Sequence, residues 1–133
     1  MSDKPLNVAI AGIGVMGMVA VRAFNRSARY RVMAIADQSP AALKRALVEV
    51  PNAVQFSSAD DLVTSKNLDR YDIDLVAVLT PPNSHARLAI QALQAKRHVF
   101  CEKPLALNSL EAKQMVAAAD IARTSSVFSI VGH

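Results

Sequence analysis

The sequence predicts an α/β fold in which helices cover both faces of a doubly wound parallel sheet, giving three layers within a single domain. Short, almost uncharged apolar stretches alternate with segments of helical character along the chain, as in parallel sheets that are buried on both faces. A glycine-rich turn joins the first of these strands to the first helix. The length of 133 residues suits one domain. With 52% hydrophobic and 20% charged residues, the composition is that of a globular protein.

The first half of the chain is expected to form three strands and two helices. The first two strands are runs of Val, Ile, Ala and Met, and each is followed by a glycine or an acidic residue. Ser39 or Asp37 is a candidate N-cap for the second helix, because Pro40 suits the first helical position. Pro51 ends that helix. The predicted elements are strand 7–11, helix 15–25, strand 31–36, helix 40–50 and a weak short strand 54–56.

The second half is expected to add three more strands. Residues 73–79, Ile-Asp-Leu-Val-Ala-Val-Leu, form the clearest buried strand, and Asn83 or Ser84 can cap the helix after it. Asn108 and Glu111 have the spacing of a capping box and open the last helix. Right-handed crossovers then give the strand order 3-2-1-4-5-6. The predicted elements are one or two helical turns within 58–65, strand 73–79, a helix to residue 95, strand 98–101, a helix to about residue 123 and strand 126–131.

Composition and charge argue against several other classes of protein. The single cysteine, Cys101, excludes an internal disulfide framework and fits a reducing compartment. The uncharged run 8–21 is shorter than the roughly 20 apolar residues that cross a bilayer. The formal net charge is +4, yet the densest basic stretch, 22–31, fits a solvated helix end and lacks the interleaved aromatic residues of a nucleic-acid surface. We therefore expect a cytoplasmic protein without nucleic-acid or membrane partners.

Residues 12–17 read Gly-Ile-Gly-Val-Met-Gly and match the pattern G-x-G-x-x-G. The pattern is weak alone, but here it follows a predicted strand and opens a predicted helix. Asp37 lies twenty residues after Gly17, at the end of the second strand. Strand, helix, spacing and acid together favour dinucleotide binding over a turn whose glycines serve packing alone.

Each glycine of this turn has an expected physical role. Gly12 allows the tight turn, Gly14 lets the backbone approach a pyrophosphate, and Gly17 lets the helix pack close to the strand. The backbone N–H groups of Val15 and Met16 then face the phosphates at the helix N-terminus.

Asp37 is the candidate for the adenosine ribose. A carboxylate there accepts hydrogen bonds from the ribose hydroxyls and disfavours a 2′-phosphate, which indicates NAD(H). Lys44 or Arg45 leaves room for NADP. Capping of the following helix is the alternative role of Asp37, and both roles are compatible.

Two further segments follow later strands, where ligands of open α/β sheets bind. Residues 80–85, Thr-Pro-Pro-Asn-Ser-His, form a rigid loop suited to the wall of a cofactor site; within it, His85 is either a proton shuttle or a packing residue. Lys103, after the fifth strand, either supplies a charge or proton beside the cofactor or belongs to a surface turn. No metal-binding cluster emerges from the sequence, and His98 and His133 are isolated.

Residues 7–17, Asp37, residues 80–85 and Glu102-Lys103-Pro104, in that order, resemble the N-terminal domain of the Gfo/Idh/MocA oxidoreductases, over essentially the whole chain. The resemblance implies an NAD(P)-binding Rossmann domain spanning 1–133. It also implies hydride transfer between the nicotinamide cofactor and a sugar, cyclitol or similar secondary alcohol, with Lys103 as the catalytic residue. The cofactor-binding residues that it implies are Gly12, Ile13, Gly14, Val15, Met16, Gly17, Asp37, Thr80, Pro81, Asn83, His85, Glu102 and Lys103.

Members of this family continue into a C-terminal domain that carries the substrate pocket, and from the resemblance we expect these 133 residues to lack it. The resemblance thus implies either a homo-oligomer or a separate chain that supplies the missing domain. A non-catalytic dinucleotide sensor or interaction module, and a truncated inactive remnant, are the alternative interpretations.

Overall fold

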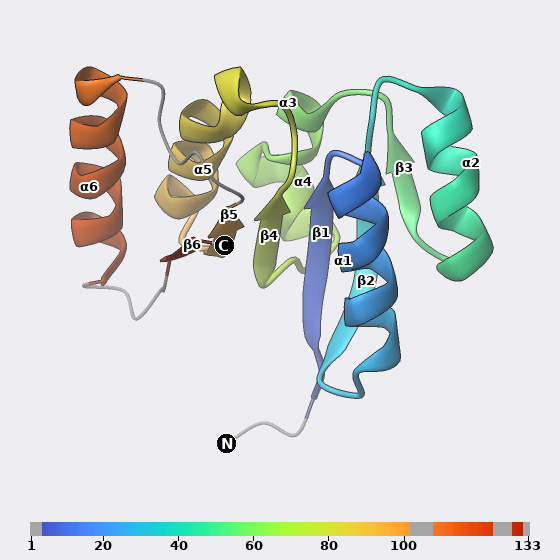
Figure 1. Cartoon of the computed structure of the whole chain (residues 1–133). Coiled ribbons are helices and arrows are strands. Elements are labelled where there is room, and N and C mark those ends of the chain that lie inside the picture. Colours follow the sequence, from blue (N-terminus) through green and yellow to red (C-terminus); the bar gives the residue numbers. More distant parts are fainter. Residues whose placement is uncertain (1–3, 102–107, 124–128, 132–133) are drawn as a thin grey trace.

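A computed structural model of the chain describes residues 4–101, 108–123 and 129–131. Its strands form one parallel sheet in the order β3-β2-β1-β4-β5-β6, with helices on both faces (Figure 1). The order is the one predicted from the sequence. The strands are β1 (Leu6–Ala11), β2 (Tyr30–Ala36), β3 (Val54–Phe56), β4 (Leu75–Val78), β5 (His98–Cys101) and β6 (Ser129–Val131).

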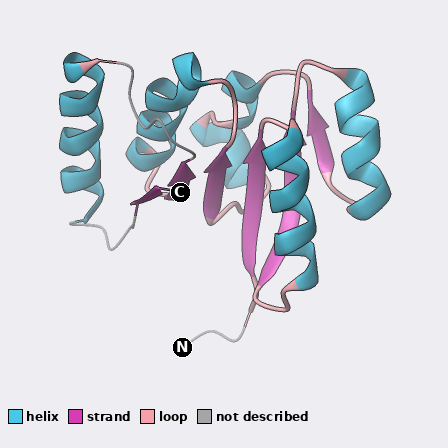
Figure 2. Ribbon diagram, in the orientation of Figure 1, coloured by secondary structure: helices cyan, strands magenta, loops and turns pink. Residues whose placement is uncertain are grey.

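The helices alternate with these strands, as Figure 2 shows. Most predicted bounds agree to within two residues. The predicted turns of 58–65 extend further and form two short helices, because Ser58 and Thr64 each cap a new helical start. Of the predicted strand 126–131, the first three residues lie outside the described ranges. The helices are α1 (Val15–Arg26), α2 (Pro40–Glu49), α3 (Ala59–Leu62), α4 (Ser65–Arg70), α5 (His85–Gln94), α6 (Ser109–Arg123) and the 3-10 helix η1 (Pro82–Ser84).

The core lies on both faces of the central strand β1. Side chains of successive strand residues point to opposite faces. Ile10 therefore packs toward α1 and α2, where Val21 and Leu43 lie, whereas Ala11 packs toward α5 and Leu88. In Figure 1, α1 lies in front of the sheet and α4 behind it. Because β1 is enclosed on both faces, its last four residues are fully buried.

The carboxyl ends of β1, β2 and β4 lie level with one another. Ala11 is the register partner of Ala36 on one side and of Val78 on the other. The backbone beyond each strand continues these links, since Gly12 N donates to Ala36 O at 2.8 Å and Leu79 N donates to Ala11 O at 2.7 Å. The chain leaves β1 toward one face and β4 toward the other, so the sheet opens at this edge into the crevice where ligands of such folds bind.

The helix caps settle one prediction and correct another. Ser39 caps α2, as its Oγ accepts a hydrogen bond from Ala42 N at 3.2 Å. At the start of α5, the prediction that Asn83 or Ser84 provides a side-chain cap was wrong. Ser84 occupies the N-cap position, but its Oγ lies 2.6 Å from Thr80 Oγ1 and 2.9 Å from Pro81 O and makes no cap bond. The turn η1 leads the chain into α5 instead.

At α6 the capping prediction is confirmed, because Asn108 Oδ1 accepts from Glu111 N at 2.9 Å. Within the described ranges, none of the helices is both long and apolar enough to cross a membrane.

Candidate functional site: a cavity at the switch point of the sheet

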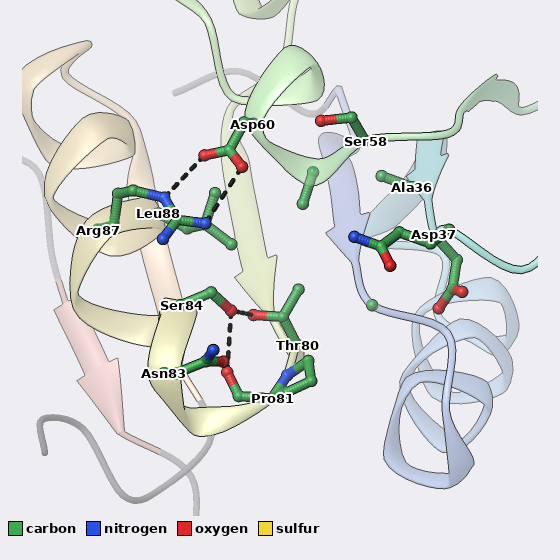
Figure 3. Close-up of a pocket in the computed structure, with 13 residues that line it drawn as sticks. Ala36, Asp37, Ser58, Asp60, Thr80, Pro81, Asn83, Ser84, Arg87 and Leu88 are labelled. Atoms are coloured by element: carbon green, nitrogen blue, oxygen red, sulfur yellow. Dashed lines mark hydrogen bonds and ion pairs between the residues drawn. The ribbon is translucent and has the colours of Figure 1, made fainter.

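A cavity of about 470 Å³ opens at the carboxyl ends of β1, β2 and β4. Figure 3 shows its walls, with β1 and β2 on one side and the loop before α5 on the other. The structure brings together five residues that the sequence singled out from three separate segments. These lining residues are Gly12, Asp37, Thr80, Pro81 and Asn83.

Gly12 is required by the fold itself. Its φ is +98°, a backbone conformation that side chains disfavour. A Cβ there would lie 2.6 Å from the backbone of Leu79 and of Thr80. The absence of a side chain thus lets the turn after β1 pass directly against the end of β4.

Gly17 is required for a different reason. A Cβ at this position would lie 2.1 Å from the carbonyl oxygen of Gly12. The first turn of α1 therefore rests on the backbone of the glycine turn. This is the close packing expected of the third glycine in the motif.

Gly14 is required by neither conformation nor packing. Its φ of −83° and ψ of −155° suit any residue, and a Cβ there would meet no protein atom within 4 Å. It occupies the N-cap position of α1 without a side chain to satisfy the first N–H groups, which have no carbonyl partner within a helix. The first turn of α1 also carries no acidic residue. Open space, unpaired donors and the positive end of the helix dipole together suit a phosphate group.

Asp37 ties the glycine turn to the end of β2. Its Oδ2 accepts from the backbone N–H of Ile13 at 2.7 Å, and its Oδ1 accepts from the backbone N–H of Ser39 at 2.8 Å. A carboxylate oxygen has lone pairs for a second hydrogen bond, so this role is compatible with the predicted contact to a ribose. The alternative of Asp37 as the N-cap of α2 is excluded because Ser39 holds that position.

The buried side chain of His85 supports the loop before α5 from the interior of the protein. The imidazole is 1% exposed, and its Nε2 lies 2.5 Å from the carbonyl oxygen of Thr80. His85 is not among the residues that line the cavity, whereas Pro81 and Asn83 are exposed and line it. The geometry therefore favours the packing role for His85 over a proton shuttle at the cavity surface.

An ion pair that the sequence did not reveal forms another part of the wall. Arg87 of α5 donates from Nε to Asp60 Oδ1 at 2.9 Å and from Nη2 to Asp60 Oδ2 at 3.1 Å, both residues lining the cavity. The hydrogen bonds that Arg87 donates to Asp60 raise the pKa of Arg87, while burial opposes this shift. No local motif signals the pair, because it joins α3 to α5 across 27 residues of sequence.

Several candidate residues lie away from the cavity or outside the described ranges. Glu102 and Lys103, including the predicted catalytic residue, fall in the segment 102–107 that the structure does not describe. Lys44 and Arg45 are exposed on α2 and do not line the cavity. Cys101 is fully buried at the end of β5, as expected of a small apolar residue. Among the described residues, no cluster of His, Cys, Asp or Glu could hold a metal ion.

A glycine turn between strand and helix, a carboxylate at the end of the next strand, and a cavity at the switch point of a doubly wound sheet define a dinucleotide-binding Rossmann domain. The chain belongs to the Gfo/Idh/MocA family, whose sequence model, described as "Oxidoreductase family, NAD-binding Rossmann fold", matches residues 6–132. This confirms the family that the motifs resembled.

Individual relatives show how much of each protein the chain matches. It is 32% identical over 120 residues to a glycosyl hydrolase family 109 protein from a Shewanella species, covering 86% of this chain and 26% of that protein. It is 30% identical over 118 residues to inositol 2-dehydrogenase from Salmonella typhimurium, covering 85% of this chain and 33% of the relative. The chain thus spans a quarter to a third of the length of these relatives.

A solved structure of scyllo-inositol dehydrogenase from Lactobacillus casei, with bound NAD(H) and scyllo-inositol, superposes on the fold with a TM-score of 0.84. The two chains are 26% identical, and the match covers 97% of this chain and 36% of the dehydrogenase.

Proposed function

We propose that this domain binds NAD(H) in the cavity at the switch point and presents the nicotinamide for hydride exchange with a secondary alcohol of a sugar or cyclitol. The observation that carries the proposal is the open space in front of Gly14. The fold needs no glycine there, and a ligand that approaches the backbone does.

The binding residues of the proposal lie in and beside the cavity, since Ile13, Gly14, Val15 and Met16 are not among its lining residues. The backbone of the glycine turn, with Ile13, Val15 and Met16, would hold the pyrophosphate at the N-terminus of α1. Asp37 would accept hydrogen bonds from the adenosine ribose through the lone pairs left by its two backbone bonds. The loop residues would form the facing wall and exclude water from the cofactor. These loop residues are Thr80, Pro81 and Asn83, with His85 holding the loop from below.

The bound cofactor supplies the hydride acceptor or donor. The chain's own contribution to the chemistry would be Lys103 and Glu102, which the family resemblance would assign to the nicotinamide ribose. A neutral amine there could accept the proton of the substrate hydroxyl as the hydride leaves, and the resulting ammonium could return that proton in the reverse reaction. Lys103 is therefore the proposed catalytic residue.

The substrate class rests on the relatives. One similar protein is an inositol 2-dehydrogenase, and a similar structure contains scyllo-inositol, which favours polyols. Another relative of comparable identity is named as a glycosyl hydrolase, so this domain alone does not determine the net reaction. The proposal places the complete enzyme in the cytoplasm, with substrate groups supplied by further chain, an oligomer partner or a separate protein.

Calorimetric titration of the chain with NADH tests the proposal. Saturable binding of one NADH per chain is expected, with inorganic pyrophosphate as a weaker competitor for the same site. A protein that remains folded and shows no saturable heat with NADH would overturn it.

A further inference from the structure

The residues that line the cavity carry an excess of negative charge. Among the described residues that line it, three are ionised at neutral pH: Asp37, Asp60 and Arg87. Their formal charges sum to one negative charge. Figure 3 shows Asp60 and Arg87 together on one wall, with Asp37 on the opposite wall.

Arg87 is the one cationic side chain among the described lining residues, and the Nε–Nη2 edge of its guanidinium is occupied. Two parallel bonds of 2.9 and 3.1 Å join it to both oxygens of Asp60. This is the bidentate geometry in which a guanidinium also binds phosphate. Asp60 thus occupies one edge with which the guanidinium could bind a phosphate, and its carboxylate offsets the positive charge of Arg87.

The pair is accessible from solvent. The side chains of Arg87 and Asp60 are 54% and 51% exposed, so a ligand in the cavity can reach them without unfolding either helix. Lys44 and Arg45, the cations that the sequence offered for a 2′-phosphate, lie on α2 outside the lining. Arg87 is therefore the described cation best placed to favour a phosphorylated ribose.

We infer that Asp60 is a determinant of cofactor choice: by holding Arg87 it keeps the cavity selective for NAD(H) against NADP(H). The inference rests on the proposed function. Two effects act together. Asp60 adds a negative charge that repels a 2′-phosphate, and it withholds the guanidinium that would neutralise one. Asp37 disfavours the same group from the other wall. The discrimination against a 2′-phosphate is therefore shared between Asp37, which follows β2, and Asp60, which lies on α3.

The expected size follows from Coulomb's law. Removing one negative charge about 10 Å from a doubly charged phosphate, in a solvent-exposed cavity, changes the affinity for that phosphate roughly five- to tenfold. The neutral ribose hydroxyl of NADH has no comparable interaction. Asp60→Asn should therefore raise the affinity for NADPH by at least this factor, because it also releases Arg87, and should change the affinity for NADH less than twofold.

The test is a comparison of NADH and NADPH dissociation constants by calorimetry in the full chain. Asp61→Asn is the matched control, because Asp61 lies on the same helix, is exposed and is absent from the cavity lining. Arg87→Gln and the double variant Asp60→Asn with Arg87→Gln complete the cycle. The gain in NADPH affinity from Asp60→Asn is expected to be larger with Arg87 present than in the Arg87→Gln background, where only the loss of the repelling charge remains.

Two results would overturn the inference. One is an Asp60→Asn variant whose preference between NADH and NADPH equals that of Asp61→Asn. The other is an equal NADPH gain with and without Arg87. Each leaves the proposed function standing if the wild-type chain binds NADH, whereas a wild-type chain without saturable NADH binding refutes the proposed function first. Thermal melts of every variant exclude unfolding as the cause of lost binding.

Discussion

A substitution at Gly14 should affect the stability of the domain and its affinity for NADH in opposite directions. Because the position lies at the N-cap of α1 in an ordinary extended conformation, with open space beyond it, it accepts an aspartate without strain. The new carboxylate would accept hydrogen bonds from the N–H groups of the first turn and interact favourably with the helix dipole. These are the donors that the proposal assigns to the pyrophosphate.

The stability of Gly14→Asp should therefore rise. A better N-cap gives a few tenths of a kcal/mol, and restricting the unfolded chain by replacing glycine gives about 0.5 kcal/mol. The charge at the helix N-terminus adds about 0.5 kcal/mol. A total of about 1 kcal/mol corresponds to roughly 4 °C in Tm for a domain of this size. Affinity for NADH should fall at least a hundredfold, because the carboxylate occupies the phosphate position and repels it.

The other two glycines should behave in the opposite way. Gly12→Ala places a Cβ 2.6 Å from backbone atoms at a φ of +98°, and Gly17→Ala places one 2.1 Å from a carbonyl oxygen. Backbone has to move in both, at a cost of about 2–4 kcal/mol. Asn108→Asp is the matched control for charge, since it changes an N-cap on α6 away from the cavity. It should leave NADH binding unchanged.

Urea unfolding and calorimetry measure both quantities on each variant. The reasoning is refuted if Gly14→Asp is destabilised as much as Gly12→Ala, because the space at Gly14 is then not open. It is equally refuted if Gly14→Asp binds NADH as tightly as the wild-type chain, because the phosphates then lie elsewhere.

Three further variants test the contacts beneath the cavity. Asp37→Ala removes the acceptor of two backbone N–H groups, those of Ile13 and Ser39, so urea unfolding should show a loss of about 2 kcal/mol together with weaker NADH binding; an unchanged stability would exclude the tie between the glycine turn and β2. Ile10→Ala deletes a fully buried side chain in β1 and should cost about 3 kcal/mol; a cost below 1 kcal/mol would contradict the packing described. Ser39→Ala removes the bond from Ala42 N and should lower stability by about 1 kcal/mol, with NADH affinity retained as the sign that the cap serves α2 alone.

The glycine turn and the strand order were predictable because they depend on local rules. Apolar runs separated by helices leave few topologies once crossovers are right-handed, and G-x-G-x-x-G with Asp37 places the turn at the end of β1. Capping of α5 was not predictable in the same way. Ser84 has the right residue type and position, but its hydroxyl bonds to Thr80 Oγ1 and to the Pro81 carbonyl oxygen and makes no cap bond.

The Asp60–Arg87 ion pair was not predicted from the sequence, again because it depends on contacts between distant segments. Its partners sit on α3 and α5, and only the crossover between β3 and β4 brings these helices to one wall. Neither residue has a spacing or neighbour that distinguishes it from any other exposed charge. For His85 the sequence did offer the packing role as one of two alternatives, and its contact with the carbonyl oxygen of Thr80 is what the structure adds.

The residues that the fold needs and the residues that a ligand needs are different parts of the same motif. Gly12 and Gly17 are held by backbone contacts within the chain, and Asp37 already binds two backbone N–H groups. A protein with this turn would need all three even if it bound nothing. Gly14 has no such requirement, so its lack of a side chain is the feature of the motif that indicates a ligand. A half-exposed ion pair contributes less than about 1 kcal/mol to stability, so the fold does not require the Asp60–Arg87 pair. By the same criterion, we infer that this pair is a better indicator of cofactor choice than Asp37 alone.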